Sequence, residues 1–204
     1  MDNSDKIKTF YEDYYTDYDT YMQRTGHYDA QIYIIDQLDD QISEPILDVA
    51  CGTGILIKKL LKKYSKISGN DFSSTMSETA KDKTSLLITN ENAEILNSYN
   101  QKFKTIICCN CLYYLQDRDK AICRWTELLE KDGKIIFLEE YPFMKPARLE
   151  MKEHADELMS LISPMAPVDI EELMNQNNLN LEKKVKTKID ENHDLFGLVF
   201  SLES

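Results

Sequence analysis

Residues 45–54 read Pro45-Ile46-Leu47-Asp48-Val49-Ala50-Cys51-Gly52-Thr53-Gly54, and this stretch decides the fold. Its first half is a short apolar run, which predicts a strand that helices cover on both faces. Gly52 and Gly54 predict a tight turn, because a backbone without Cβ can bend there and approach a ligand closely. An amphipathic helix is expected over 55–64. Strand, glycine turn and helix in this order predict an α/β fold that holds a cofactor at the turn.

Asp71 follows the next predicted strand, residues 66–70, and lies 19 residues after Gly52 (71 − 52). A carboxylate at the end of that strand can accept the hydroxyl protons of a ribose. A dinucleotide site requires a third glycine, but Ile57 stands at that position. The pattern therefore favours a nucleoside-containing cofactor that has no pyrophosphate.

Strands and helices alternate along the rest of the chain, which predicts parallel strands joined by helices. A helical region over 5–38, interrupted at Gly26, comes first. We expect a three-layer α/β/α sandwich whose seven-stranded sheet is mostly parallel, with an antiparallel C-terminal strand. Further strands are predicted over 85–89, 103–110, 134–139, 181–189 and 195–202, and further helices over 118–129, 147–162 and 170–177. Three local signals support these boundaries: Ser73 as a helix N-cap, a turn at Asp132-Gly133, and a capping box of Asp169 with Glu172.

The balance of charge limits the partners. The chain has 36 acidic and 24 basic residues, a formal net charge of −12. Such a surface repels phosphate backbones and anionic lipids, so nucleic acid and membranes are not expected partners. A neutral or cationic small molecule fits better, and a basic peptide stays open. An acidic, polar start and the lack of a long apolar run predict a cytoplasmic location.

Five cysteines, with Cys108, Cys109 and Cys111 close together, do not form a disulfide framework. Cys108 and Cys111 have C-x-x-C spacing, but a structural zinc site needs a second ligand pair, and the sequence offers none. A redox motif should open a helix, whereas this one lies in an apolar run. We expect free thiols that pack as small hydrophobic groups in a buried strand, and no metal site.

Several motifs in order resemble those of class I S-adenosylmethionine (SAM)-dependent methyltransferases. The segment 48–54 resembles the first motif, 69–76 the second, which carries the ribose-binding acid, and 92–96 the third. Residues 103–115 and 129–134 resemble the fourth strand and the turn before the fifth. The resemblance implies a Rossmann-like methyltransferase domain over 41–204 and an N-terminal helical lid over 1–40 in the same domain. The cofactor would be SAM and the product S-adenosylhomocysteine (SAH).

The resemblance also implies roles for the matched residues. Gly52 and Gly54 would approach the methionine part of SAM, Asp71 would hold the ribose, and Arg24 could pair with the methionine carboxylate. Ala50 replaces the usual first glycine, Asn92 the usual Asp of the third motif, and Tyr114 a frequent His. The predicted cofactor-binding set is Tyr21, Arg24, Asp48, Ala50, Cys51, Gly52, Gly54, Asp71, Phe72, Met76, Asn92, Ala93, Glu94, Asn110 and Leu115, in which Phe72 and Met76 would sandwich the adenine.

The acceptor is expected at the ends of the fourth and fifth strands, beneath the N-terminal helix. Methyl transfer from an activated sulfonium depends chiefly on alignment, so no single catalytic residue is required. The candidates are Tyr14, Tyr18, Asn110, Tyr114 and Glu140. We expect a small-molecule acceptor, N- or O-methylation, and a monomer or homodimer.

Three other functions stay open on the sequence alone. A catalytically inactive SAM-binding regulatory or partner subunit would share every cofactor motif. A nicotinamide oxidoreductase would use the same glycine turn. A thiol-based metalloid methyltransferase would use Cys51, Cys108, Cys109 or Cys111.

Overall fold

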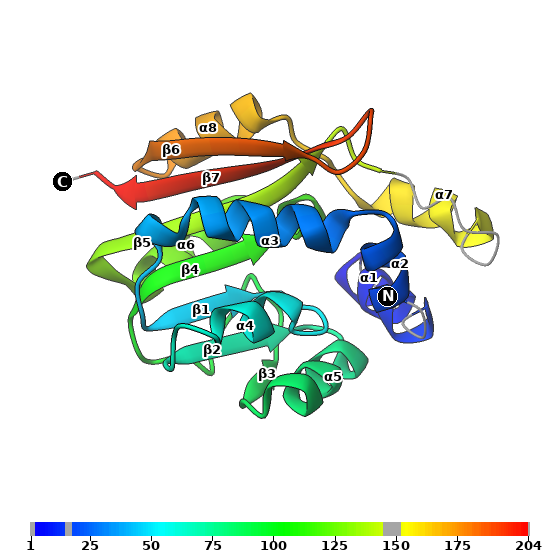
Figure 1. The fold of residues 1–204 in the computed structure, drawn as a ribbon, viewed down its shortest axis with the longest axis horizontal. Coiled ribbons are helices and arrows are strands. Elements are labelled where there is room, and N and C mark those ends of the chain that lie inside the picture. The colour runs from blue at the N-terminus through cyan, green and yellow to red at the C-terminus, as the bar shows by residue number, and fades with distance from the viewer. Residues whose placement is uncertain (1–2, 15–17, 145–151, 204) are drawn as a thin grey trace.

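A computed structural model describes residues 3–14, 18–144 and 152–203. Its centre is one seven-stranded sheet in the order β3-β2-β1-β4-β5-β7-β6 (Figure 1). The first five strands pair in parallel, and β7 pairs antiparallel with both of its neighbours. This arrangement confirms the predicted sheet. The strands are β1 Ile46–Val49, β2 Ile67–Asp71, β3 Ile88–Asn90, β4 Phe103–Cys109, β5 Leu129–Tyr141, β6 Leu179–Lys188 and β7 Asp194–Leu202.

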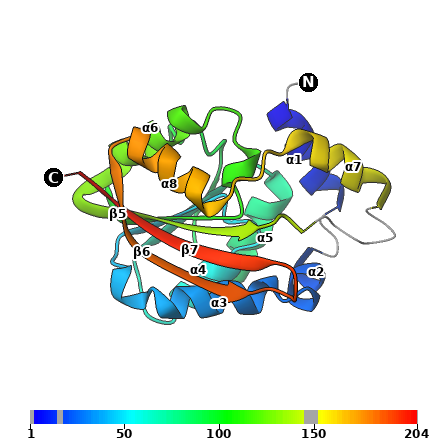
Figure 2. The same ribbon diagram turned by 90° about the horizontal axis from the view of Figure 1, so that it is seen from above.

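Helices cover both faces of the sheet (Figure 2). On one face α3 (His27–Gln37), α4 (Ile55–Leu60) and α5 (Ser74–Thr84) bury Ile34, Ile57 and Ala80 against the strands. On the other face α6 (Arg118–Leu128) and α8 (Pro167–Gln176) do the same. The sheet is thus the middle layer of the predicted three-layer sandwich.

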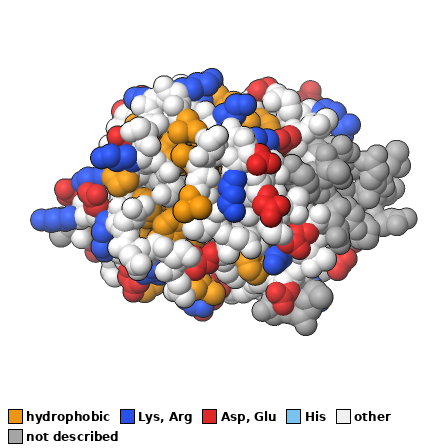
Figure 3. All heavy atoms as spheres, turned by 90° about the horizontal axis from the view of Figure 1, so that it is seen from below, with side chains coloured by type: hydrophobic (Ala, Val, Ile, Leu, Met, Phe, Trp, Pro, Cys, Tyr) orange, Lys and Arg blue, Asp and Glu red, His pale blue; other side chains and the backbone are white. Residues whose placement is uncertain are grey.

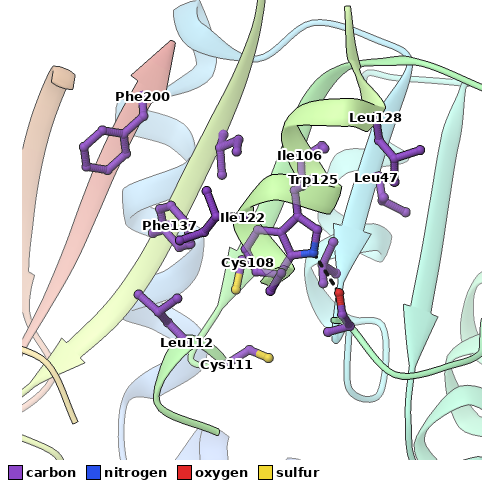
Figure 4. Packing of buried hydrophobic residues seen from close by; sticks show 14 of the residues in the cluster. Leu47, Ile106, Cys108, Cys111, Leu112, Ile122, Trp125, Leu128, Phe137 and Phe200 are labelled. Atoms are coloured by element: carbon purple, nitrogen blue, oxygen red, sulfur yellow. Dashed lines mark hydrogen bonds between the residues drawn. The ribbon is translucent and has the colours of Figure 1, made fainter. Parts of the chain in front are cut away.

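Trp125 of α6 is the largest fully buried side chain and packs against Phe137 of β5 (Figure 4). Its indole Nε1–H donates a 2.8 Å hydrogen bond to the backbone carbonyl of Ala93. A buried indole requires such an acceptor, because an unpartnered N–H in an apolar core costs free energy. The bond also fixes the loop after β3, where the third predicted motif lies.

Three helices lie at the carboxyl end of the sheet (Figure 1). α1 (Asn3–Tyr14) lies against α5 and α7 (Lys152–Leu161), and α2 (Tyr18–Arg24) leads into α3. Phe10, Leu158 and Ile162 form a small apolar cluster with Tyr113 of the short helix η3 (Leu112–Tyr114). The region predicted as a lid over 1–40 therefore divides: α1 and α2 cover the strand ends, whereas α3 belongs to the sandwich.

The predicted break at Gly26 separates α2 from α3, and residues 15–17, between α1 and α2, lie outside the described residues. Two local predictions were wrong. β5 begins at Leu129, so Asp132-Gly133 lies within the strand, where the pairing with β4 shifts register. Asp169 is the third residue of α8 and accepts the Ala166 N–H at 3.1 Å, so it does not cap with Glu172. Ser73 does cap α5, by accepting the Met76 N–H at 3.3 Å. The helix predicted over 147–162 is described only as Lys152–Leu161, and residues 147–151 lie outside the described residues.

Acidic and basic side chains are interspersed on the face shown in Figure 3, and no continuous basic patch covers its described part. Among the described residues, no helix is long and apolar enough to cross a bilayer. The described His, Cys, Asp and Glu side chains likewise form no cluster that could hold a metal ion.

Candidate cofactor and acceptor site

The site lies where the chain changes direction in the sheet. β1 pairs with β2 on one side and with β4 on the other. The connections that follow β1 and β4 lead to α4 and α6 on opposite faces of the sheet, which leaves a crevice between them. Ligands of open α/β sheets bind at such a switch point. A cavity of about 120 Å³, the main cavity, occupies this crevice. Its wall includes the predicted residues Tyr18, Ala50, Gly52, Asp71, Phe72, Met76, Asn92, Ala93, Glu94, Asn110, Tyr114 and Leu115.

The glycine turn takes a left-handed path through Ala50, Gly52 and Gly54, with φ values of 53°, 55° and 78°. A Cβ added at Gly52 would meet no protein atom within 4 Å, whereas one added at Gly54 would lie 3.1 Å from the Ala80 side chain. Gly54 thus permits the close packing of α4 on α5. Gly52 borders open space, so a side chain there would enter the cavity and compete with a ligand.

Asp71 connects the end of β2 to that turn. Its Oδ2 accepts the Gly52 N–H at 2.8 Å, and its Oδ1 accepts the Ser73 N–H at 2.9 Å. Burial raises the pKa of Asp71 to about 6, although both backbone bonds oppose this shift. Each carboxylate oxygen retains a lone pair that can accept a ligand hydroxyl. The carboxylate is therefore fixed in place and still able to hold the two hydroxyls of a ribose.

Asp48 is a buried carboxylate at the end of β1, and neither oxygen has a hydrogen-bond partner among the described residues. It borders a smaller cavity together with Cys51, Gly52, Thr53 and Tyr28. Burial, and then the nearby charge of Asp71, raise the pKa of Asp48 to about 8. An unpartnered buried carboxylate is costly unless a cation or donor meets it. SAM carries a sulfonium and an ammonium, so these residues fit that cofactor.

The side chains predicted to hold adenine lie together on the other side of Asp71. Met76 and Ala93 are buried, Phe72 is partly buried, and the Lys8 ammonium of α1 lies 5.3 Å from the centre of the Phe72 ring. Asn92 uses its Oδ1 to accept the Glu94 N–H at 2.8 Å. The Asn92 oxygen is thus already in a backbone bond and has one lone pair left for a ligand.

A second cavity, of about 70 Å³, shares Tyr11, Tyr18, Asn110 and Tyr114 with the first. The wall of this aromatic cavity consists largely of aromatic rings and includes Tyr21 and Glu140 from the predicted set. Burial raises the pKa of Tyr18 and Tyr114 well above the usual phenol value. These two tyrosines are therefore neutral hydrogen-bonding groups. The Tyr11 and Tyr114 hydroxyls are hydrogen-bonded to each other across the boundary of the two cavities.

Sequence reasoning predicted Glu140 but missed its partner His27, and it also missed Asp19. His27 and Glu140 form a buried pair, Nε2 to Oε2, at 2.8 Å. Asp19 of α2 accepts the hydroxyls of Tyr28 and Thr53, each at 2.6 Å, and forms an ion pair with Lys83 of α5. These contacts join residues up to 113 positions apart, and no local spacing indicates such contacts.

The remaining predicted residues lie in different places. Arg24 is exposed on α2 and does not line the main cavity. Glu94 lines it and also accepts the Gln116 N–H at 2.7 Å. The Tyr14 side chain lies outside the described residues. Cys51, Cys108 and Cys111 are buried free thiols, and burial raises the pKa of Cys108 and Cys109, which opposes a thiolate-based reaction.

Known sequences match the central part of this chain. Residues 46–133 match the family described as a methyltransferase domain. An uncharacterized methyltransferase of Anoxybacillus flavithermus is 32% identical over 114 residues, which cover 54% of this chain and 53% of that protein. A ubiquinone biosynthesis O-methyltransferase of Coxiella burnetii is 31% identical over 97 residues, 45% of this chain and 42% of that protein. The chain spans about half the length of these relatives.

Solved structures share the whole fold. Magnesium protoporphyrin IX methyltransferase from Synechocystis, solved with SAH bound, superposes with a TM-score of 0.72 at 15% identity, covering 99% of this chain and 100% of that one. A SAM-dependent methyltransferase from Clostridium acetobutylicum gives 0.62 at 17% identity, with all of both chains covered. At these identities the likeness concerns the fold alone. The chain thus has the fold of class I, Rossmann-like SAM-dependent methyltransferases, and its residues 46–133 match a methyltransferase domain.

Proposed function

We propose that this protein binds SAM in the main cavity and transfers its methyl group to a small molecule in the aromatic cavity. The observation that carries the proposal is the pair of carboxylates on either side of the open turn at Gly52, the buried Asp48 and the partly buried Asp71. Asp71 would hold the ribose, and Asp48 would offset the positive charge of the methionine end. The Phe72 ring and the Met76 side chain would hold the adenine.

SAM supplies a methyl group that its sulfonium already activates towards in-line displacement. The contribution of the chain is then alignment, which can supply about 7–11 kcal/mol of the barrier when reacting atoms are held near contact. Asn110 and Tyr18 line both cavities and are placed to hold the two ligands against each other. The tyrosine hydroxyls can orient an acceptor but, as neutral phenols, cannot remove its proton.

A small acceptor suits the size of the second cavity and the mixed charges of the surface in Figure 3. The Coxiella relative is named an O-methyltransferase, which is consistent with N- or O-methylation. A regulatory subunit that binds SAM without turnover would share the main cavity but would not require the adjoining aromatic one.

Release of SAH from SAM in the presence of an acceptor library tests the proposal. We expect acceptor-dependent SAH formation by the parent protein and its loss in Asp71→Ala. Tight SAM binding without turnover of any acceptor would favour the regulatory alternative.

A further inference from the structure

The wall of the aromatic cavity contains one buried polar pair. His27 is the first residue of α3, and Glu140 is the penultimate residue of β5. Both side chains line the cavity, and both are about 5% exposed or less. Their Nε2 and Oε2 atoms are 2.8 Å apart. A buried polar group without a hydrogen bond is costly, and each of these two groups provides a partner for the other.

Hydrogen-bond counting places one proton between them. The Thr25 hydroxyl donates its only proton to backbone carbonyls, that of Tyr21 at 2.9 Å and that of Met22 at 3.3 Å. Thr25 Oγ1 also lies 2.6 Å from Nδ1 of His27, so it accepts the Nδ1–H there. Nε2 then either accepts a proton from Glu140 or shares one with the Glu140 carboxylate. In both cases the pair holds one proton in the Nε2–Oε2 bond and has no net charge.

Glu140 can take a second proton. Among the described residues, no hydrogen bond reaches its Oε1. Its backbone N–H donates to Asn110 Oδ1 at 3.0 Å, and Asn110 lines both cavities. The Glu140 backbone is thus tied to the residue that stands at the junction between cofactor and acceptor. Tyr18 and Tyr114, whose phenols stay protonated, offer no competing base at this junction.

We propose that Glu140 removes a proton from a neutral hydroxyl of an apolar acceptor and that His27 positions Glu140 and receives the displaced proton. This inference rests on the proposed function. The acceptor O–H proton moves to Oε1, the proton of the pair finishes on Nε2, and the acceptor oxygen bonds the methyl carbon as the C–S electron pair stays on sulfur. The positive charge lost by the sulfonium reappears on the imidazolium, so total charge is conserved.

The cavity favours a hydroxyl over an ammonium or a carboxylate. Its described lining is mostly rings and apolar chains, such as Met22, Phe143 and Leu158. A cation would enter beside a pair without net charge and near the sulfonium, and an anion would find no free cationic side chain among the described lining residues. A neutral hydroxyl avoids both desolvation costs.

Three naphthalene probes separate these head groups: 2-naphthol, 2-(aminomethyl)naphthalene and 2-naphthoate. Binding to the protein saturated with SAH is followed by ligand-observed NMR, and methylation by SAH release from SAM. We expect 2-naphthol to bind at least tenfold more tightly than the other two and to be the one methylated. Preference for the amine or the carboxylate, or no binding of 2-naphthol, would overturn the acceptor class.

Glu140→Gln tests the base, because its amide can still donate to Nε2 but cannot take a proton. We expect kcat for 2-naphthol to fall about 100-fold or more, with KM for SAM unchanged. Glu130→Gln, at the other end of the same strand, is the matched control and should keep the parent rate. Thr25→Val, which leaves Nδ1–H without its acceptor, should lower kcat and shift its pH profile while SAM binding persists.

A parent rate in Glu140→Gln would contradict the role of the pair. The proposed function fails separately, if the parent protein does not bind SAM at all. If SAM binds and Glu140→Gln does not fold, the pH profile and kcat of Thr25→Val decide, and parent values there would overturn the proposal.

Discussion

The carboxylate of Asp71 accepts the backbone N–H of Gly52 at 2.8 Å, across 19 residues of sequence. This bond joins the end of β2 to the turn after β1 and gives the two cofactor motifs one fixed geometry. It also leaves the turn open, since Gly52 faces space that no protein atom fills. The pairing therefore prepares a site for a ligand with hydroxyls near Asp71 and a compact group near the turn.

Gly52→Ala tests that open space. Its methyl would project into the cavity without a clash in the protein, while the positive φ costs about 1–2 kcal/mol of stability. We expect SAM affinity to fall by more than tenfold with only a modest drop in the free energy of unfolding, measured by calorimetric titration and urea denaturation. Ala50→Gly, at the adjacent position of positive φ, is the control and should retain binding; equal loss in both variants would argue against a ligand at Gly52.

Asp48→Asn tests the unpartnered carboxylate. The unfolded chain ionises this group near pH ~4, whereas burial raises its folded pKa to about 8. Between these values the folded protein binds more protons than the unfolded one, so the free energy of unfolding falls as pH rises. We expect the parent to lose stability more steeply than Asp48→Asn between pH 4 and pH 8 in urea titrations. Parallel curves would show that Asp48 ionises normally.

The same substitution should weaken SAM binding at pH 8, because it removes a negative charge beside the cationic end of the cofactor. Stability and affinity would then move in opposite directions. Calorimetric titration at pH 8 measures the affinity, and an unchanged dissociation constant would remove Asp48 from the site.

Asp19→Asn tests how α1 and α2 are held over the strand ends. Asp19 joins α2 to Thr53 of the turn and to Lys83 of α5. A neutral amide cannot accept all of these bonds or pair with the ammonium, so we expect α1 and α2 to exchange amide hydrogens faster, with β1 and β4 unchanged. Asp82→Asn, an exposed residue of α5, is the matched control. Unchanged exchange in α2 would mean that Asp19 does not hold α2 in place.

Trp125→Phe tests the link between core and cofactor loop. The change removes the Nε1–H that bonds the Ala93 carbonyl and leaves that carbonyl unpartnered. We expect a loss of about 1–3 kcal/mol in the free energy of unfolding by urea denaturation and a several-fold weaker SAM affinity, since Ala93 lines the main cavity. Affinity equal to the parent would show that the loop keeps its shape without the bond.

Much of the fold followed from local sequence. The apolar run before Gly52 predicts β1 because a strand buried on both faces has no polar alternation, and the terminal hairpin follows from two strands joined by a short link. The errors arose where tertiary contacts override local signals. Asp132-Gly133 has the composition of a turn, but β5 continues through it and pairs with β4 at Leu129 before it and at Lys134 after it.

The site residues, too, were predicted where local sequence determines them and missed where tertiary contacts do. Residues in contiguous motifs, such as Gly52 and Asp71, were found from spacing and line one cavity. His27 and Glu140 were not found as a pair, because their contact depends on how α3 enters the sandwich beside β5. Arg24 was assigned by its place after an aromatic helix, a signal that does not fix the direction of a side chain, and it is exposed.

Calorimetric titration of the parent protein and Asp71→Ala with SAM, SAH and NAD⁺ tests the central claim most directly. We predict that the parent binds SAM and SAH but not NAD⁺. Asp71→Ala should weaken SAM binding by about 1–3 kcal/mol, roughly 5- to 150-fold, through the loss of charge-assisted hydrogen bonds. Binding of NAD⁺ in preference to SAM, or an affinity for SAM that Asp71→Ala leaves unchanged, would contradict the account.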